Sequence, residues 1–184
     1  YQGRLYFMPR KKIREKTEEL LEFCGLIDFR RRTVRKLSGG MKRKLMVCRA
    51  LLTEPEILLL DEPTAGMDAL SRRQMWNLLR QLNDHNLTIL LTTHYMEEAE
   101  SLCQRVAFMD RGRLEEVSEP KKMVEQLGHF AVDEMTSDGL KSHYFKNRED
   151  AIAHLSRLTG QTALRNTTLE DVFVARAEQK ERQR

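Results

Sequence analysis

The chain has 184 residues, of which 40% are hydrophobic and 33% are charged, a composition typical of a folded domain and not of a disordered segment. No apolar run approaches the roughly 18 residues needed to span a bilayer, so we expect any membrane role to come through a partner. The three cysteines are isolated and odd in number, which disfavours a metal site or a disulfide framework and favours reduced thiols.

The net charge of +4 is unevenly distributed along the chain. Residues 1–50 carry 15 Lys or Arg and 5 Asp or Glu, whereas the remainder carries 17 and 23. A basic half can indicate a nucleic-acid partner or an acidic membrane surface. The basic runs at 10–12, 30–32 and 42–44 have no interleaved stacking aromatics, so we do not expect nucleic-acid binding.

Two helices are predicted in the first third of the chain. Apolar residues at helical spacing predict one over 11–24, closed by Gly25. Ser38 is a good N-cap for a second helix that runs to about Thr53, before Pro55 stops it. We therefore expect a helical subdomain at about 10–54.

Strands and helices then alternate. The apolar run from Ile57 to Leu60 predicts a fully buried parallel strand, and Asp68 caps a helix that continues through Asn83. The next predicted elements are a strand over 88–91, a helix over 97–103, and strands over 105–109 and 113–117. This order predicts an α/β fold whose core, at 55–117, is a parallel sheet flanked by helices.

The pattern changes after Gly128. Short strands are predicted at 130–132 and 144–145, and a helix over 148–158. The sequence from Thr167 to Glu170 fits a capping box that opens a final helix. We predict that residues 1–128 form the main domain and that 129–184 form a small α+β appendage.

Asp61 and Glu62 follow the first predicted strand, at the end where open α/β sheets bind their ligands. Phosphoryl transfer needs a metal ion and a group that orients the attacking water. Asp61 suits a Mg²⁺ shell, through water, and Glu62 suits polarisation of the nucleophilic water. An adjacent Asp-Glu pair at a strand end is also common on protein surfaces, but the apolar run before it and Pro63 after it favour the chemical interpretation.

Three further positions are candidates. Ser38, Gly39 and Gly40 open a helix whose unpaired N–H groups favour an anion, although Ser-Gly-Gly by itself indicates only a cap. His94 ends the strand that contains Thr92 and Thr93, and its imidazole can hydrogen-bond a phosphate, although a lone His is usually structural. Asp68 is interpreted first as a helix cap.

The order and spacing of Leu37-Ser38-Gly39-Gly40-Met41, the Asp61-Glu62 strand and His94 resemble the ATP-binding-cassette (ABC) ATPase family. The resemblance covers roughly residues 1–127, and Met41 with the basic residues after it is similar to the drug-exporter and ABC-A-like branches. It implies a P-loop-NTPase-type fold in which Glu62 and His94 are catalytic and Asp61 belongs to Walker B. Ser38, Gly39 and Gly40 are then the signature that contacts the ATP of a partner subunit, and Asp68 belongs to the D-loop.

The same resemblance implies ATP and Mg²⁺ as cofactors and a second ABC subunit in a head-to-tail dimer. It also implies an integral membrane permease as partner, and a cytoplasmic location on the inner face of the cell membrane. The function expected is an ATPase that couples hydrolysis to export of drugs or lipids. A non-transport ABC ATPase that acts on ribosomes or DNA is the alternative.

The Gly-x-x-x-x-Gly-Lys-Ser/Thr phosphate loop does not occur in the sequence. The chain also opens on Tyr1 in mid-pattern, which fits a fragment, and we expect residues 1–184 by themselves to bind ATP weakly and not to hydrolyse it. An inert partial domain therefore remains open beside the functional interpretation.

Overall fold

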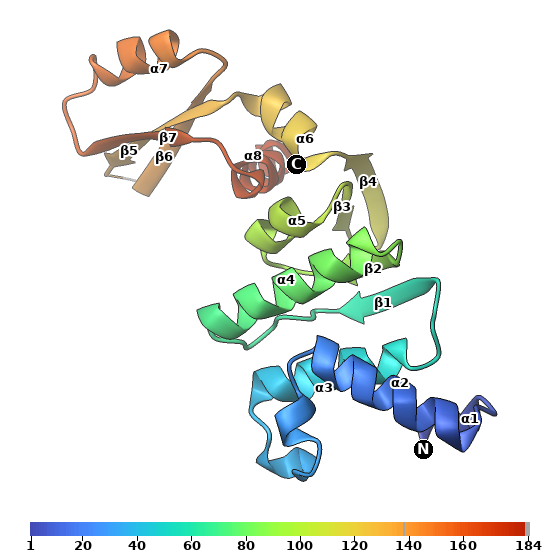
Figure 1. The fold of residues 1–184 in the computed structure, drawn as a ribbon. Helices are drawn as coiled ribbons and strands as arrows, with labels where there is room; N and C mark the ends of the chain where they lie inside the picture. Colours follow the sequence, from blue (N-terminus) through green and yellow to red (C-terminus); the bar gives the residue numbers. More distant parts are fainter. Residues whose placement is uncertain (138, 183–184) are drawn as a thin grey trace. The chain divides into compact units, whose positions relative to one another are not determined.

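The computed structural model describes residues 1–137 and 139–182 (Figure 1). The chain divides into two compact units, one from Tyr1 to His94 and one that begins at Tyr95. The domain boundary predicted at residue 128 remains a prediction. In chain order, the first unit contains α1 (Gln2–Leu5), α2 (Arg10–Phe23), η1 (Ile27–Phe29), η2 (Val34–Lys36), α3 (Gly39–Leu51), β1 (Ile57–Asp61), α4 (Ala69–Asp84) and β2 (Thr88–Thr92).

The two predicted helices of the helical subdomain form and pack against each other. α2 begins after Pro9 and ends before Gly25, which adopts a positive φ of 67°. The Cys48 thiol of α3 donates a hydrogen bond to the Leu20 carbonyl of α2, at 3.4 Å. The segment between these helices contains the 3₁₀ turns η1 and η2.

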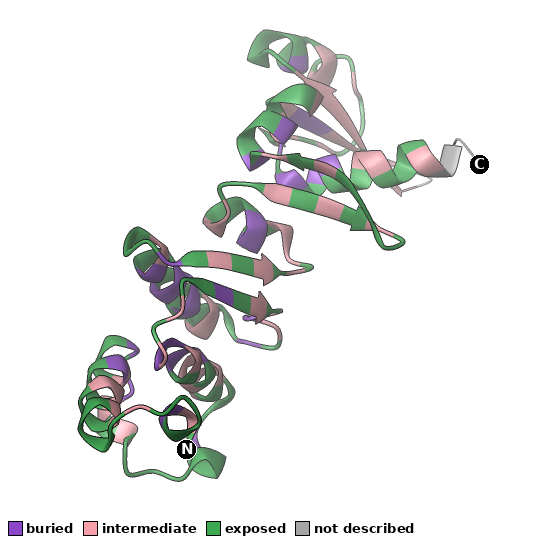
Figure 2. Cartoon of the chain, turned by 90° about the vertical axis from the view of Figure 1, so that its right-hand side faces the viewer, coloured by how far each residue is buried: buried purple, intermediate pink, exposed green. Residues whose placement is uncertain are grey.

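Strands β1 and β2 are parallel neighbours, as predicted, and Asp61 lies opposite Thr92 in their register. One face of β1 is covered, since Leu58 is only 4% exposed. The other face is open, with Leu59 70% and Leu90 64% exposed, and the alternation is visible in Figure 2. The prediction of a fully buried strand is therefore wrong, because successive side chains point to opposite faces and only one face is covered in this unit.

The second unit contains α5 (Met96–Leu102), β3 (Val106–Asp110), β4 (Arg113–Ser118), α6 (Pro120–Leu127), β5 (Phe130–Thr136), β6 (Gly139–Phe145), α7 (Arg148–Leu155), β7 (Thr162–Asn166) and α8 (Leu169–Arg182). Strand β3 pairs with β4 as an antiparallel hairpin and does not extend the parallel pair. Ala99, Met123, Leu169 and Val172, from α5, α6 and α8, form a buried core cluster. The α/β fold class is confirmed.

A three-stranded antiparallel sheet, in the order β6–β5–β7, occupies the C-terminal part of this unit. Arg165 of β7 reaches Asp133 of β5 and Asp171 of α8. Asp171 also accepts a hydrogen bond from the Thr168 N–H at 2.8 Å and one from the Thr168 hydroxyl at 3.0 Å. The capping box of α8 therefore starts at Thr168 and not at Thr167, one residue later than predicted.

Two further observations concern membrane-spanning helices and the cysteines. Across residues 1–137 and 139–182, no helix is both long enough and apolar enough to cross a membrane. Cys24, Cys48 and Cys103 are free cysteines in the same described part of the chain.

Candidate functional site

The turn after β1 fixes the direction of the Glu62 side chain. Glu62 has a φ of 46°, in the left-handed region that non-glycine residues seldom adopt. Its carbonyl accepts a hydrogen bond from the Ala65 N–H at 3.2 Å, and the following Pro63 and Thr64 are buried. The chain thus reverses sharply at the sheet edge, and a strained backbone at such a place is typical of functional sites.

Glu62 faces His94 across the ends of the two parallel strands. Glu62 Oε2 lies 2.8 Å from His94 Nδ1, and the side chains are 34% and 62% exposed, respectively. The Oε2 atom is shielded from solvent and accepts no hydrogen bond of good geometry from the described residues. A shielded acceptor with unused capacity can bind a water molecule or a substrate hydrogen.

Asp61 is held by the next strand. The Thr92 hydroxyl donates a short hydrogen bond to Asp61 Oδ1. The Glu62 N–H is shared between the Thr92 carbonyl at 3.1 Å and the Thr92 Oγ1 at 3.3 Å. The two carboxylate residues are thus both tied to the last residue of β2, and the structure brings Asp61, Glu62 and His94 into one cluster.

A second cluster joins the beginnings of α3 and α4. Ser38 Oγ accepts a hydrogen bond from the Met41 N–H at 3.2 Å, and Asp68 Oδ1 accepts one from the Ser71 N–H at 2.9 Å, so both predicted N-caps are confirmed. Hydrogen bonds from Ser71 lower the pKa of Asp68 below its usual value. A Cβ added at Gly40 would lie 3.1 Å from both Cβ and Oγ of Ser71, so the two helices approach closely at this glycine.

The predicted site residues therefore form two groups. Asp61, Glu62 and His94 share the strand edge, whereas Ser38, Gly39, Gly40 and Asp68 share the helix starts. Thr92 is the residue whose role the sequence analysis missed. The available signal was that a polar residue ends the second predicted strand, at the same sheet edge as Asp61; the structure places it directly opposite Asp61.

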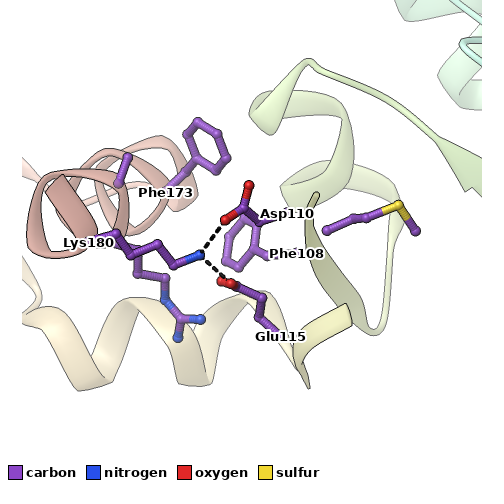
Figure 3. A pocket seen from close by; sticks show the side chains of 8 residues that line it. Phe108, Asp110, Glu115, Phe173 and Lys180 are labelled. Atoms are coloured by element: carbon purple, nitrogen blue, oxygen red, sulfur yellow. Dashed lines mark hydrogen bonds and ion pairs between the residues drawn. The ribbon is translucent and has the colours of Figure 1, made fainter. Parts of the chain in front are cut away.

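The second unit contains a hollow of about 220 Å³ between α8 and the β3–β4 hairpin (Figure 3). Lys180 reaches Asp110, at 3.1 Å, and also Glu115. The rings of Phe108 and Phe173 lie 5.8 Å apart between centroids. Because these charged groups pair with one another, we interpret the residues around the hollow as the packing contact between α8 and the hairpin.

The α/β fold is of the P-loop-NTPase type. Residues 4–65 match the family profile described as ABC transporter. The chain resembles a solved ATP-binding cassette of an ABC transporter in its ADP conformation, with a TM-score of 0.60 at 24% identity, covering 65% of this chain and 47% of the other. At that identity the likeness shows the fold alone.

The similar curated proteins have names that describe them as ATP-binding proteins involved in resistance or in export. The daunorubicin resistance ATP-binding protein DrrA3 of Streptomyces coeruleorubidus is 46% identical over 61% of this chain and 35% of its own length. The Nod factor export ATP-binding protein I of Burkholderia lata is 36% identical over 94% of this chain and 64% of its own length. The linearmycin resistance ATP-binding protein LnrL of Bacillus subtilis is 31% identical over 85% and 50%, respectively.

The chain is similar in sequence to ABC transporter ATP-binding proteins over most of its length, and similar in fold to a solved ATP-binding cassette. It spans about a third to two thirds of the length of these relatives. The resemblance inferred from the sequence motifs is thereby confirmed.

Proposed function

We propose that the intact protein is the ATP-hydrolysing subunit of an ABC exporter and drives a membrane permease. The observation that carries the proposal is the shielded Glu62 Oε2 beside His94 at the ends of two parallel strands. The names of the relatives, which refer to resistance and export, favour transport over action on ribosomes or DNA.

Glu62 is the group that orients the attacking water, because its shielded oxygen has capacity for one more hydrogen. His94 is more exposed and contacts the same carboxylate, and in this proposal it hydrogen-bonds the γ-phosphate of the substrate. The left-handed backbone at Glu62 keeps its side chain directed at the imidazole. Turnover thus depends on Glu62 and His94 acting together.

Asp61 would hold Mg²⁺ through water. Mg²⁺ in proteins is usually bound through one or two carboxylates together with waters and substrate phosphates. An exposed carboxylate at the strand end therefore fits the ion. When bound, Mg²⁺ supplies neutralisation of the phosphate charge.

Ser38, Gly39, Gly40 and Asp68 would serve a second ABC subunit in a head-to-tail dimer. This role is supported by their position at the N-termini of α3 and α4. The N–H groups and dipoles of helix N-termini favour anionic oxygens. We place the protein at the cytoplasmic face of the membrane, attached through the permease.

The test is Glu62→Gln in the intact protein. The amide keeps the size of the side chain but cannot act as a base, so ATP turnover should fall by about 10²–10⁴-fold. Nucleotide affinity should stay unchanged, and the ATP-bound dimer should become long-lived. Steady-state phosphate release, nucleotide titration and size-exclusion chromatography measure the three properties.

Glu56→Gln is the matched control, because Glu56 is an exposed carboxylate that directly precedes the same strand. It should hydrolyse ATP at the wild-type rate. Wild-type turnover in Glu62→Gln would remove Glu62 from the mechanism, and equal losses in both variants would indicate a general effect of charge.

A further inference from the structure

Thr92 contacts both Asp61 and Glu62. Its hydroxyl donates to Asp61 Oδ1, and its Oγ1 and carbonyl oxygen both lie within hydrogen-bonding distance of the Glu62 N–H. These contacts come from β2, so they connect residues about thirty positions apart in sequence. They depend on the parallel register that places Thr92 opposite Asp61.

The hydroxyl has a single hydrogen, and its direction is therefore informative. Because that hydrogen is donated to Asp61, the lone pairs of Oγ1 remain to accept the Glu62 N–H. One side chain thus limits rotation of the Asp61 carboxylate and anchors the left-handed backbone of Glu62. A residue in such a backbone conformation persists only where surrounding contacts hold it.

Thr92 has no evident role in the core. It lies on the exposed face of β2, the face that also carries Leu90 and Thr88. Thr88 shares its strand, its face and its residue type, but it lies opposite the apolar Ile57. Contact with the carboxylates is therefore what distinguishes Thr92 from Thr88.

We propose that Thr92 is a positioning residue for hydrolysis: its hydroxyl orients Asp61 toward the metal ion and holds Glu62 in place. This inference rests on the roles proposed above for Asp61 and Glu62. Groups that orient a metal-binding carboxylate usually contribute about 10–100-fold to metal affinity or activity.

The test compares four variants of the intact protein. Thr92→Val removes the hydroxyl and keeps the shape and strand preference, Thr92→Ala removes it without the second branch, and Thr92→Ser retains it. Thr88→Val makes the same chemical change at the matched position. Mn²⁺ is the metal probe, and its affinity in the presence of a non-hydrolysable ATP analogue is measured by electron paramagnetic resonance, alongside ATP turnover as a function of Mg²⁺ and thermal unfolding.

Thr92→Val and Thr92→Ala should both weaken Mn²⁺ binding by about tenfold and raise the Mg²⁺ needed for half-maximal turnover by a similar factor. Thr92→Ser should restore both values, and Thr88→Val should match the wild type. Unchanged Mn²⁺ affinity in both Thr92→Val and Thr92→Ala overturns the proposal. So does a loss of Mn²⁺ affinity that also appears in Thr92→Ser. If Glu62→Gln hydrolyses ATP normally, the proposed function has failed, and the Mn²⁺ measurement still reports on Thr92.

Discussion

Two carboxylate clusters, one in each unit, differ in how their oxygens are paired. In the first, Glu62 faces His94 with both side chains at least one-third exposed and with one carboxylate oxygen left without a good hydrogen bond. In the second, Arg165 donates four hydrogen bonds, 2.6–3.0 Å long, to Asp133 and Asp171, whose side chains are 14% and 9% exposed. The Glu62–His94 pair is thus the more exposed of the two clusters, whereas the Arg165 network is largely buried and fully hydrogen-bonded.

Among the changes that test this comparison, His94→Ala in the intact protein should have the largest effect. Loss of the imidazole should lower ATP turnover by about 100-fold, while the exposed position should keep the change in unfolding free energy within about 0.5 kcal/mol. Phosphate release and thermal unfolding test both parts. His85→Ala is the control for turnover, because it removes an exposed histidine that directly follows α4 and contacts its last turn; it should hydrolyse ATP at the wild-type rate. A large loss of stability in His94→Ala would indicate that His94 stabilises the fold, as the ion pairs of Arg165 do in the second unit.

Asp171→Ala should show the reverse. It breaks two hydrogen bonds to Arg165 and removes the cap of α8, so we expect a loss of about 2–3 kcal/mol in unfolding free energy. Chemical denaturation of the chain measures it. Glu170→Ala deletes an exposed carboxylate from the same helical turn and should cost less than about 0.5 kcal/mol. Equal losses of unfolding free energy in the two variants would support the sequence-based prediction, in which the capping box starts at Thr167.

Acid should weaken the second unit through the same network. Burial opposes ionisation of Asp171 and of Asp133, but hydrogen bonds from Arg165 and other donors outweigh it, and the pKa of each carboxyl lies below its usual value. A lowered folded-state pKa stabilises the protein above the unfolded pKa of about 4, and this contribution is lost as pH falls through the folded value. Unfolding followed from pH 6 to 2 should show this loss, with a smaller slope in Asp171→Ala. An identical slope in the two proteins would contradict the assignment.

The smallest effect concerns packing in the first unit. Gly40→Ala places a methyl group 3.1 Å from Ser71 Cβ, an atom fixed to the α4 backbone, whereas Gly39→Ala meets no atom within 4 Å. We expect Gly40→Ala to be less stable than Gly39→Ala by about 1 kcal/mol. Thermal unfolding of the two variants makes the comparison directly. If they unfold alike, the α3 and α4 starts are not as closely packed as the structure indicates.

Local signals in the sequence were sufficient for much of the first unit. The Ser38 and Asp68 caps depend on atoms three residues away, and the strands that end at Asp61 and Thr92 are short apolar runs. The residues of the strand edge could be nominated because parallel strands end at the same edge of a sheet. The roles assigned to them remain proposals.

Long-range contacts explain most of what the sequence did not reveal. Strand β7 has little apolar alternation, and it forms beside β5, where Arg165 meets Asp133. The role of Thr92 depends on a register between strands about thirty residues apart. The one-residue error at α8 has a different cause: Thr167 and Thr168 are both suitable caps, and the hydrogen bonds between Thr168 and Asp171 select the second.

The left-handed backbone of Glu62 governs which replacements this position tolerates. Glycine adopts that conformation without a steric penalty and asparagine adopts it readily, whereas Val and Ile are strongly disfavoured there. In a substitution series at residue 62, stability and ATP turnover should therefore change independently. The Gly variant should be more stable than the native protein but inactive. The native glutamate would then be an instance in which activity is kept at the expense of stability.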